Sequence, residues 1–162
     1  MRVNGRPNIF TDDLKLDGAE RGFRAIELLR RAGAERLGGT LYELRAGSPG
    51  LPLHFHHGNE EVLIVLSGSP TVRTLDGEST LTPGDVVAFP TGSRGAHAIE
   101  NRTSEAVRYL MLSTRIQPDV VEYPDAGTVR ATTRSVFDPP PRSGDPVDAL
   151  NVLFDRTSAI ED

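Results

Sequence analysis

The 162-residue sequence contains no cysteine and no long apolar run. The absence of cysteine excludes disulfide bridges, cysteine-ligated zinc ribbons and thiol catalysis. The first eight residues, Met-Arg-Val-Asn-Gly-Arg-Pro-Asn, lack the apolar stretch of a secretion signal, and no segment approaches the length of a membrane span. We therefore expect a soluble, cytoplasmic protein that has no membrane partner.

Basic residues are also in the minority. The chain has 18 lysines and arginines against 23 aspartates and glutamates, which gives a formal net charge of −5. It also has no basic patch with interleaved aromatic residues. These features argue against a general affinity for nucleic acid or for anionic membranes.

Short apolar segments alternate with turns that contain glycine or proline, and the chain has the length of one domain. Asp76-Gly77 is the strongest hairpin signal between two such segments. Strands separated by about eight to twelve residues predict an all-β sandwich or barrel. We expect strands over 40–45, 61–66, 71–75, 78–81, 86–89, 96–100 and 106–114.

The barrel core is expected over 40–115. Residues 1–39 are expected to form an N-terminal arm and an edge strand, and 116–162 a C-terminal extension of the same domain. Within the first part, 22–37 fits a helix face and strand alternation equally well, so periodicity leaves both open.

The C-terminal extension carries two weaker signals. A strand is possible over 129–137. Further on, Asp145-Pro146 resembles the start of a short helix with Val147, Leu150 and Phe154 on one face.

Histidine is rare, and three of the four histidines could act together. His54 and His56 are two residues apart, so on an extended segment both rings point to the same side. A turn after them can bring back a carboxylate, from either Glu60 or Glu61, and His97 is a distant fourth donor. A single buried histidine is more often a hydrogen-bonded core residue. Four converging donors of this type instead favour a divalent transition metal.

Two motifs resemble those of the cupin superfamily. His54-x-His56-x4-Glu61-x6-Gly68 is similar to its first motif, and Gly84-x5-Pro90-x-Gly92-x4-His97-x3-Asn101 to its second. Two intervals depart from the usual pattern, since Gly47 is one residue further from His54 and His97 is two residues further from Gly92. The spacing from His97 to Asn101 is kept, so the extra residues are assigned to the 93–96 loop and His97 is expected to point inward.

The resemblance implies a double-stranded β-helix, the jelly-roll barrel of small single-domain bacterial cupins. It implies one divalent transition metal ion, with Fe, Mn, Zn and Ni not distinguished, held by His54, His56, Glu61 and His97. It selects Glu61 over Glu60 by its distance from Gly68. It further implies a small-molecule ligand in the barrel and a homodimer.

Both faces of the segment 61–66 are apolar, because Val62, Ile64 and Leu66 alternate with Leu63 and Val65. An apolar outer face must be covered, either by the arms of the chain or by a second subunit.

The resemblance supports two hypotheses about function. The first is a metal-dependent enzyme that acts on a small oxygen-rich metabolite by dioxygenase-like, isomerase or lyase chemistry. Tyr42 and Glu43 are candidate acids or bases because their strand should line the barrel. The lack of a further histidine favours chemistry carried by the metal over a proton-shuttling isomerisation. The alternative hypothesis is a non-catalytic cupin that binds or senses a small molecule.

Overall fold

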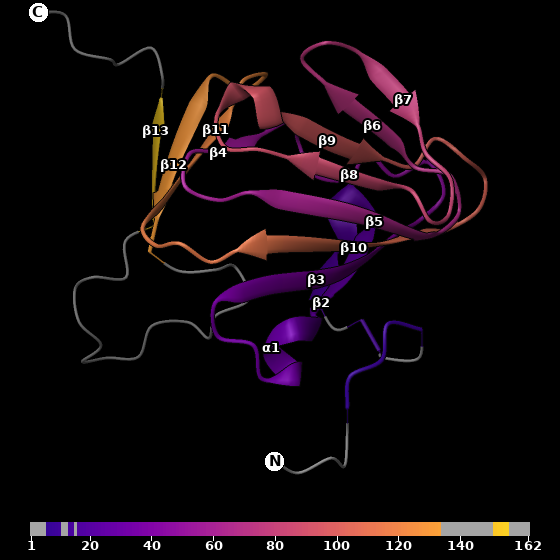
Figure 1. Ribbon diagram of the computed structural model, residues 1–162. Coiled ribbons are helices and arrows are strands. Elements are labelled where there is room, and N and C mark those ends of the chain that lie inside the picture. The colour runs from indigo at the N-terminus through magenta and orange to yellow at the C-terminus, as the bar shows by residue number, and fades with distance from the viewer. Residues whose placement is uncertain (1–5, 11–12, 15, 134–150, 156–162) are drawn as a thin grey trace, which may run out of the picture.

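The computed structural model describes residues 6–10, 13–14, 16–133 and 151–155. Antiparallel strands dominate this part of the chain and form three sheets that build a jelly-roll barrel (Figure 1). The short helices are η1 (Ala19–Arg21), α1 (Leu28–Ala32) and η2 (Ser93–Gly95). Within the described ranges, no helix has the length and hydropathy to cross a membrane.

A six-stranded sheet forms one side of the barrel. Its strands in spatial order are β1 (Leu16–Gly18), β2 (Phe23–Glu27), β3 (Leu37–Leu44), β10 (Val107–Thr114), β5 (Glu61–Ser67) and β8 (Val86–Phe89). A three-stranded sheet consists of β7 (Glu78–Thr80), β6 (Thr71–Thr74) and β9 (His97–Glu100). The fold therefore has the two-sided architecture that the alternating segments and turns predict.

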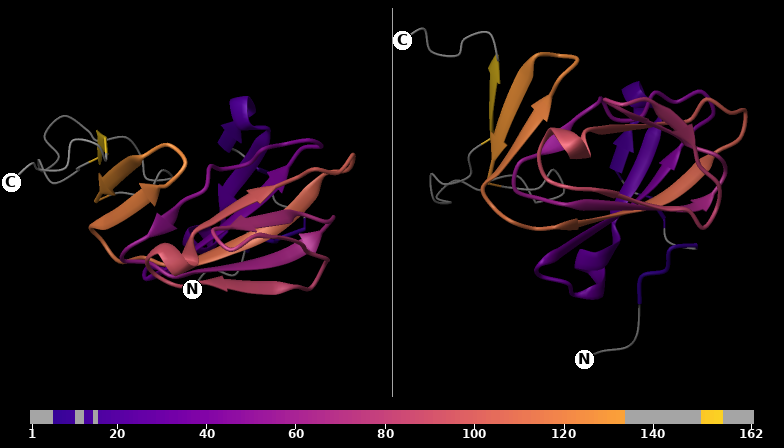
Figure 2. Two further views of the ribbon diagram at one scale, coloured as in Figure 1. Left: turned by 90° about the horizontal axis from the view of Figure 1, so that it is seen from above. Right: turned by 45° about the horizontal axis from the view of Figure 1, so that its top comes forward.

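A four-stranded sheet stands at the end of the barrel opposite the β6–β7 hairpin (Figure 1). In spatial order it contains β13 (Asn151–Asp155), β12 (Thr128–Thr132), β11 (Asp119–Tyr123) and β4 (Phe55–His56). Figure 2 shows this sheet beside the barrel in both further views. Strand β4 belongs to the first histidine motif, so this sheet joins the C-terminal strands to the ligand region.

The main hydrophobic core lies between the six-stranded and three-stranded sheets. Leu63 and Val65 of β5 are fully buried and pack with Val72 of β6 and Ile99 of β9. A second cluster lies next to the histidine motifs and contains Leu53, Phe55, Ala96 and Ala98. The inward residues of each strand alternate with outward ones, as the period of two requires.

The ambiguous segment 22–37 contains both of the structures that its pattern allows. Phe23–Glu27 is strand β2, which pairs with β3, and Leu28–Ala32 is helix α1. The helix ends at Gly33, whose φ of 96° is in the left-handed region that favours glycine.

The chain covers part of its own outer sheet face. Ile9 and Leu14 of the N-terminal part pack with Ile26, Leu41 and Leu66 on the outside of the six-stranded sheet. The expected need for a cover over this apolar face is thus partly met by the arm.

The C-terminal extension differs from the expectation. Strand β11 was not predicted, and β12 overlaps only the start of the strand expected over 129–137, whose last four residues lie outside the described ranges. The expected helix is wrong over 151–155, because β13 pairs antiparallel with β12 along five residue pairs. A short helix has little stability of its own, whereas an open strand edge offers a full set of backbone partners. Asp145, Pro146, Val147 and Leu150 lie outside the described residues.

Candidate metal centre

Backbone hydrogen bonds hold the two histidine motifs side by side. His54 and His97 face each other in an antiparallel bridge, with N–H to carbonyl distances of 3.0 and 2.9 Å. The Gly92 N–H donates to the carbonyl oxygen of His56 at 2.8 Å. Residues far apart in sequence are therefore fixed next to each other before any side chain is considered.

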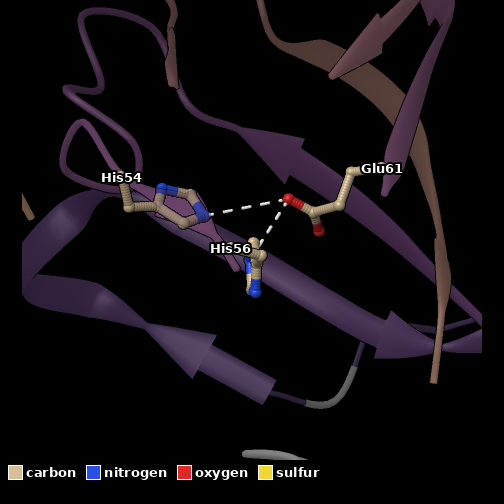
Figure 3. A group of neighbouring side chains, drawn as sticks. All are labelled: His54, His56 and Glu61. Atoms are coloured by element: carbon tan, nitrogen blue, oxygen red, sulfur yellow. Dashed lines mark ion pairs between the residues drawn. The ribbon is translucent and has the colours of Figure 1, made fainter. Parts of the chain in front are cut away.

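The side chains of these motifs converge on one carboxylate oxygen. Glu61 Oε2 lies 3.3 Å from Nε2 of both His56 and His97, and 3.9 Å from Nε2 of His54. Figure 3 shows the His54 and His56 rings directed toward the Glu61 carboxylate, with dashed lines that join both rings to one of its oxygens. One ligand atom from each of His54, His56 and Glu61 lies within 4.8 Å of the other two. The structure thus brings all four predicted residues together, and His97 points inward as expected.

The opposite nitrogen of each ring is held by an acceptor. His54 Nδ1 lies 2.8 Å from the Pro52 carbonyl, and His97 Nδ1 lies 2.8 Å from the Gly95 carbonyl. A carbonyl oxygen can only accept, so each Nδ1 donates a proton and leaves Nε2 with its lone pair when the ring is neutral. His56 Nδ1 lies 2.6 Å from Asp119 Oδ2. This is the outer-shell arrangement that orients histidine toward a metal.

Neighbouring rings restrict two of the histidines. The His97 ring stacks on Phe89 with a centroid distance of 3.8 Å, and the His54 ring stacks on Tyr123 at 5.9 Å. His97 is only 2% exposed. The rings are therefore held in place by packing as well as by hydrogen bonds.

Burial and charge shift the pKa values of the cluster in different directions. Burial lowers the pKa of His54, and burial followed by the charge of His54 lowers the pKa of His97 to about 4. Burial also opposes the charge on His56, but Asp119 and Glu61 outweigh it and raise the pKa to about 10. Burial would raise the pKa of Glu61, yet the surrounding histidines, His56 first, lower it to about 2. At neutral pH the cluster therefore holds an ionised carboxylate next to two neutral imidazoles and one protonated imidazole.

The donor set fits a divalent transition metal. Glu61 Oε2 is buried, and no donor among the described residues reaches it with hydrogen-bond geometry. This oxygen lies 3.9 Å from Nε2 of His54 and 3.3 Å from Nε2 of His97, whose neutral rings direct their lone pairs toward the same point. A cation at this point would satisfy all of these atoms, and neutral imidazole with carboxylate suits Zn, Fe, Mn or Ni.

The other residues considered from the sequence lie outside this cluster. Glu60 is exposed, and its backbone N–H donates to Thr114 Oγ1 at 3.1 Å. His57 is exposed, with Nε2 at 2.8 Å from Glu122 Oε1. Both observations agree with the choice of Glu61 and with a turn position for His57.

A cavity of about 370 Å³ opens onto the cluster. Tyr42 lines the cavity and Glu43 does not, because neighbouring residues on a strand face opposite sides of the sheet. The Glu43 carboxylate instead forms ion pairs with Arg24 and Arg108. Tyr42 stacks on Tyr109 at 5.1 Å, and burial followed by the charge of Glu61 raises its pKa above the ordinary value. The phenol is therefore protonated at neutral pH and can act as a donor.

The C-terminal strands supply a wall of the cavity that the sequence did not reveal. The wall residues are Asp119, Val121 and Tyr123 of β11 with Arg130 and Thr132 of β12. The only local signal was the alternation of Asp119, Val121 and Tyr123, which indicates a strand but not its partner. The rest of the lining includes the polar residues Glu27, Thr40, Asn59, Ser113, Thr114, Arg115 and Gln117.

Several solved structures resemble this fold. A provisionally assigned sugar phosphate isomerase from Acidithiobacillus ferrooxidans is 25% identical, covers 86% of this chain and 80% of its own, and has a TM-score of 0.72. A sugar phosphate isomerase of the cupin superfamily from Silicibacter pomeroyi is 22% identical, with coverages of 91% and 85% and a TM-score of 0.73. A predicted oxalate decarboxylase from Thermotoga maritima is 23% identical, with coverages of 57% and 79% and a TM-score of 0.51.

No curated protein matches the chain. Residues 40–113 match the family model of the cupin domain. Together with the jelly-roll barrel and the two histidine motifs, this match shows that the chain contains a small cupin domain over residues 40–113.

Proposed function

We propose that this cupin is a metal-dependent isomerase that acts on a small, anionic, polyhydroxylated compound. The observation that carries the proposal is the convergence of three Nε2 atoms and the buried Glu61 oxygen at a cavity of about 370 Å³ that polar and apolar residues line. A cavity of that size accommodates a small metabolite.

The proposed metal ligands are His54, His56, Glu61 and His97. A bound divalent ion would polarise a carbonyl oxygen of the substrate and so acidify the neighbouring C–H. The protonated Tyr42 hydroxyl would donate a hydrogen bond to a substrate oxygen in the same cavity. Of the two candidate acids or bases named from the sequence, Tyr42 and Glu43, only Tyr42 lines this cavity.

An anionic substrate is supported by Arg130, which lines the cavity; Arg115 lines it as well, but its guanidinium is ion-paired with Glu27 at 2.9 Å. Arg130 lies opposite Val121, and Val121 lies opposite His56, so the three residues form a row across the sheet. Since neighbouring strands are about 4.8 Å apart, Arg130 starts roughly 10 Å from the metal-ligand strand. Arginine binds phosphate and carboxylate well. A sugar-sized molecule could thus place its anionic group at Arg130 and its carbonyl near His56.

The comparisons support the same class. The structures named as sugar phosphate isomerases cover 86% and 91% of this chain, which necessarily includes strands outside residues 40–113. The similarity to the predicted oxalate decarboxylase covers a smaller share of this chain, 57%.

Metal content tests the first part of the proposal. Tag-free protein is analysed for metals beside His54→Ala and the control His57→Ala. We expect about one equivalent in the wild type and in His57→Ala, and a large loss in His54→Ala. Absence of metal from the wild type even after reconstitution would overturn the proposal.

Turnover tests the second part. The loaded protein is incubated in D₂O with aldose and ketose phosphates, and NMR follows isomerisation and deuterium uptake next to the carbonyl. Arg130→Gln is expected to raise KM more than it lowers kcat, because it removes a contact to an unreacting group. Binding of these compounds without exchange or turnover would favour the alternative function, a non-catalytic binding or sensing cupin.

We also propose a homodimer through the outer face of the six-stranded sheet. Val62 and Ile64 are partly exposed there, and Val86 on the edge strand β8 is 62% exposed. Val86→Asp is expected to shift the wild-type dimer to a monomer in light scattering. A monomeric wild type would contradict this proposal.

A further inference from the structure

Asp119 is the first residue of β11 and lies outside the residues that match the cupin family model. It is 5% exposed, yet it carries a carboxylate. Its Oδ2 lies 2.6 Å from Nδ1 of His56. Its Oδ1 is buried, and no hydrogen-bond partner for it exists in the described part of the chain.

The fold brings this carboxylate to the cluster through backbone pairing. Val121 lies opposite His56, and Glu122 lies opposite Phe55, so β11 is in register with the ligand strand β4. The His57 N–H donates to the Val120 carbonyl at 2.8 Å and continues this pairing. The pairing of the C-terminal extension with the ligand strand β4 therefore sets the position of Asp119.

The energetics indicate a role other than stability. A buried carboxylate with one unsatisfied oxygen costs free energy, and a hydrogen bond to a single histidine offsets only part of that cost. A partner at Nδ1 does, however, fix the ring orientation and leave Nε2 facing Glu61, 3.3 Å away. The carboxylate also increases the basicity of the ring as a ligand.

We propose that Asp119 is a positioning residue that holds His56 as a metal ligand, so that the C-terminal extension forms part of the metal centre. The inference rests on the proposed metal site. It assigns Asp119 no contact with the substrate. Its effect on the metal is exerted through His56 alone.

The test measures Co²⁺ affinity of the full chain by competition with a chromophoric chelator, together with the visible spectrum of the bound ion. Removal of an outer-shell partner lowers metal affinity by about 10- to 100-fold. We expect a loss near the upper end of that range for Asp119→Ala. Asp119→Asn keeps an acceptor without the charge, so its affinity is expected to lie between those of Asp119→Ala and the wild type. The spectrum of Asp119→Ala should differ from that of the wild type because His56 is no longer held in one orientation.

The chain offers a matched control on the same strand. Glu122 also contacts a histidine, with Oε1 at 2.8 Å from His57 Nε2, but that histidine is not a proposed ligand. Glu122→Gln is expected to bind Co²⁺ like the wild type and with the same spectrum. An equal loss in Glu122→Gln would show that the strand, not the contact with His56, matters, and would overturn the inference.

A double-mutant cycle tests the route of the effect. If Asp119 acts through His56, Asp119→Ala should lower Co²⁺ affinity in the wild type but add nothing in His56→Ala. If Asp119→Ala does not fold, Asp119→Asn takes its place throughout. A dissociation constant of the folded variant within about twofold of the wild type refutes the inference. A wild type that binds no Co²⁺ refutes the proposed function instead, so the two failures are distinguishable.

Discussion

The charge of Glu61 determines how much the histidine cluster contributes to stability, and Glu61→Gln isolates that charge. Glutamine keeps the shape of the side chain and resembles the protonated acid. In the folded protein the pKa of Glu61 falls from 4.5 to about 2, because the surrounding histidines outweigh burial. Each pKa unit corresponds to about 1.4 kcal/mol, so folding favours the charged form by about 3 kcal/mol. The contact between Glu61 and His56 also contributes to the raised pKa of His56, so the His56 shift is not counted a second time in this free energy.

The sign of the pH dependence follows from the lowered pKa. The stabilisation is fully present above pH 4.5 and is lost as pH falls toward about 2. We expect Glu61→Gln to lower the free energy of unfolding of chelator-treated protein by about 3 kcal/mol at pH 7, measured by urea denaturation. The difference from the wild type should shrink below pH 4.5.

Glu60→Gln is the matched control, since Glu60 is the exposed neighbour of Glu61. It is expected to change the free energy of unfolding by less than about 0.5 kcal/mol. Wild-type stability of Glu61→Gln at pH 7 would refute the reasoning, as would an equal loss in Glu60→Gln.

Three further predictions concern the ligands and a turn. His97→Ala should lower metal affinity at least tenfold (~1.4 kcal/mol) in chelator competition, whereas His57→Ala should leave it unchanged; equal affinities would remove His97 from the ligand set. Because the pKa of His56 is raised to about 10, the ring is protonated at pH 7 and must lose its proton to bind a metal ion. Metal binding at pH 7 should therefore release about one proton, which calorimetry detects as a binding heat that depends on the buffer. A binding heat that is the same in all buffers would contradict this prediction. Gly68 has a φ of +75°, and a Cβ at this position would lie 2.8 Å from a valine methyl of β10. Backbone strain and this overlap should together lower the free energy of unfolding of Gly68→Ala by about 2–4 kcal/mol. Gly47 has a φ of +68°, but no atom lies within 4 Å of a Cβ built there, so Gly47→Ala should lower the free energy of unfolding by only about 1–2 kcal/mol. Equal losses in the two variants, measured by thermal or urea unfolding, would rule out a contribution from the overlap.

Much of the barrel could be predicted from local patterns. The strands expected over 61–66 and 86–89 are confirmed as β5 and β8, and the Asp76-Gly77 hairpin joins β6 to β7. Alternation and turn chemistry are properties of neighbouring residues, so they can be read from a single segment. The region 22–37 marks the limit, because its pattern matched a strand and a helix and the chain forms one after the other.

The site was predictable as far as the motifs reached. The spacing of the motifs selected His54, His56, Glu61 and His97, and the structure gathers these side chains at one point. The cavity wall was not predictable. Asp119 and Arg130 belong to strands whose importance comes from pairing with β4 and with each other, and no pattern within 116–133 specifies those partners.

The sequence by itself determined where the strands of the barrel core lie along the chain and which residues are ligand candidates, because strand periodicity, turns and motif spacing are local. Only the tertiary structure decided which strand β4 pairs with, and hence that a carboxylate 63 residues away holds His56. Likewise, it decided that 151–155 is a strand, because the open edge of β12 supplies backbone partners that a local helix pattern does not include. Pairing between distant segments depends on the shape of the whole sheet, and this information is spread over the chain rather than contained in any one stretch.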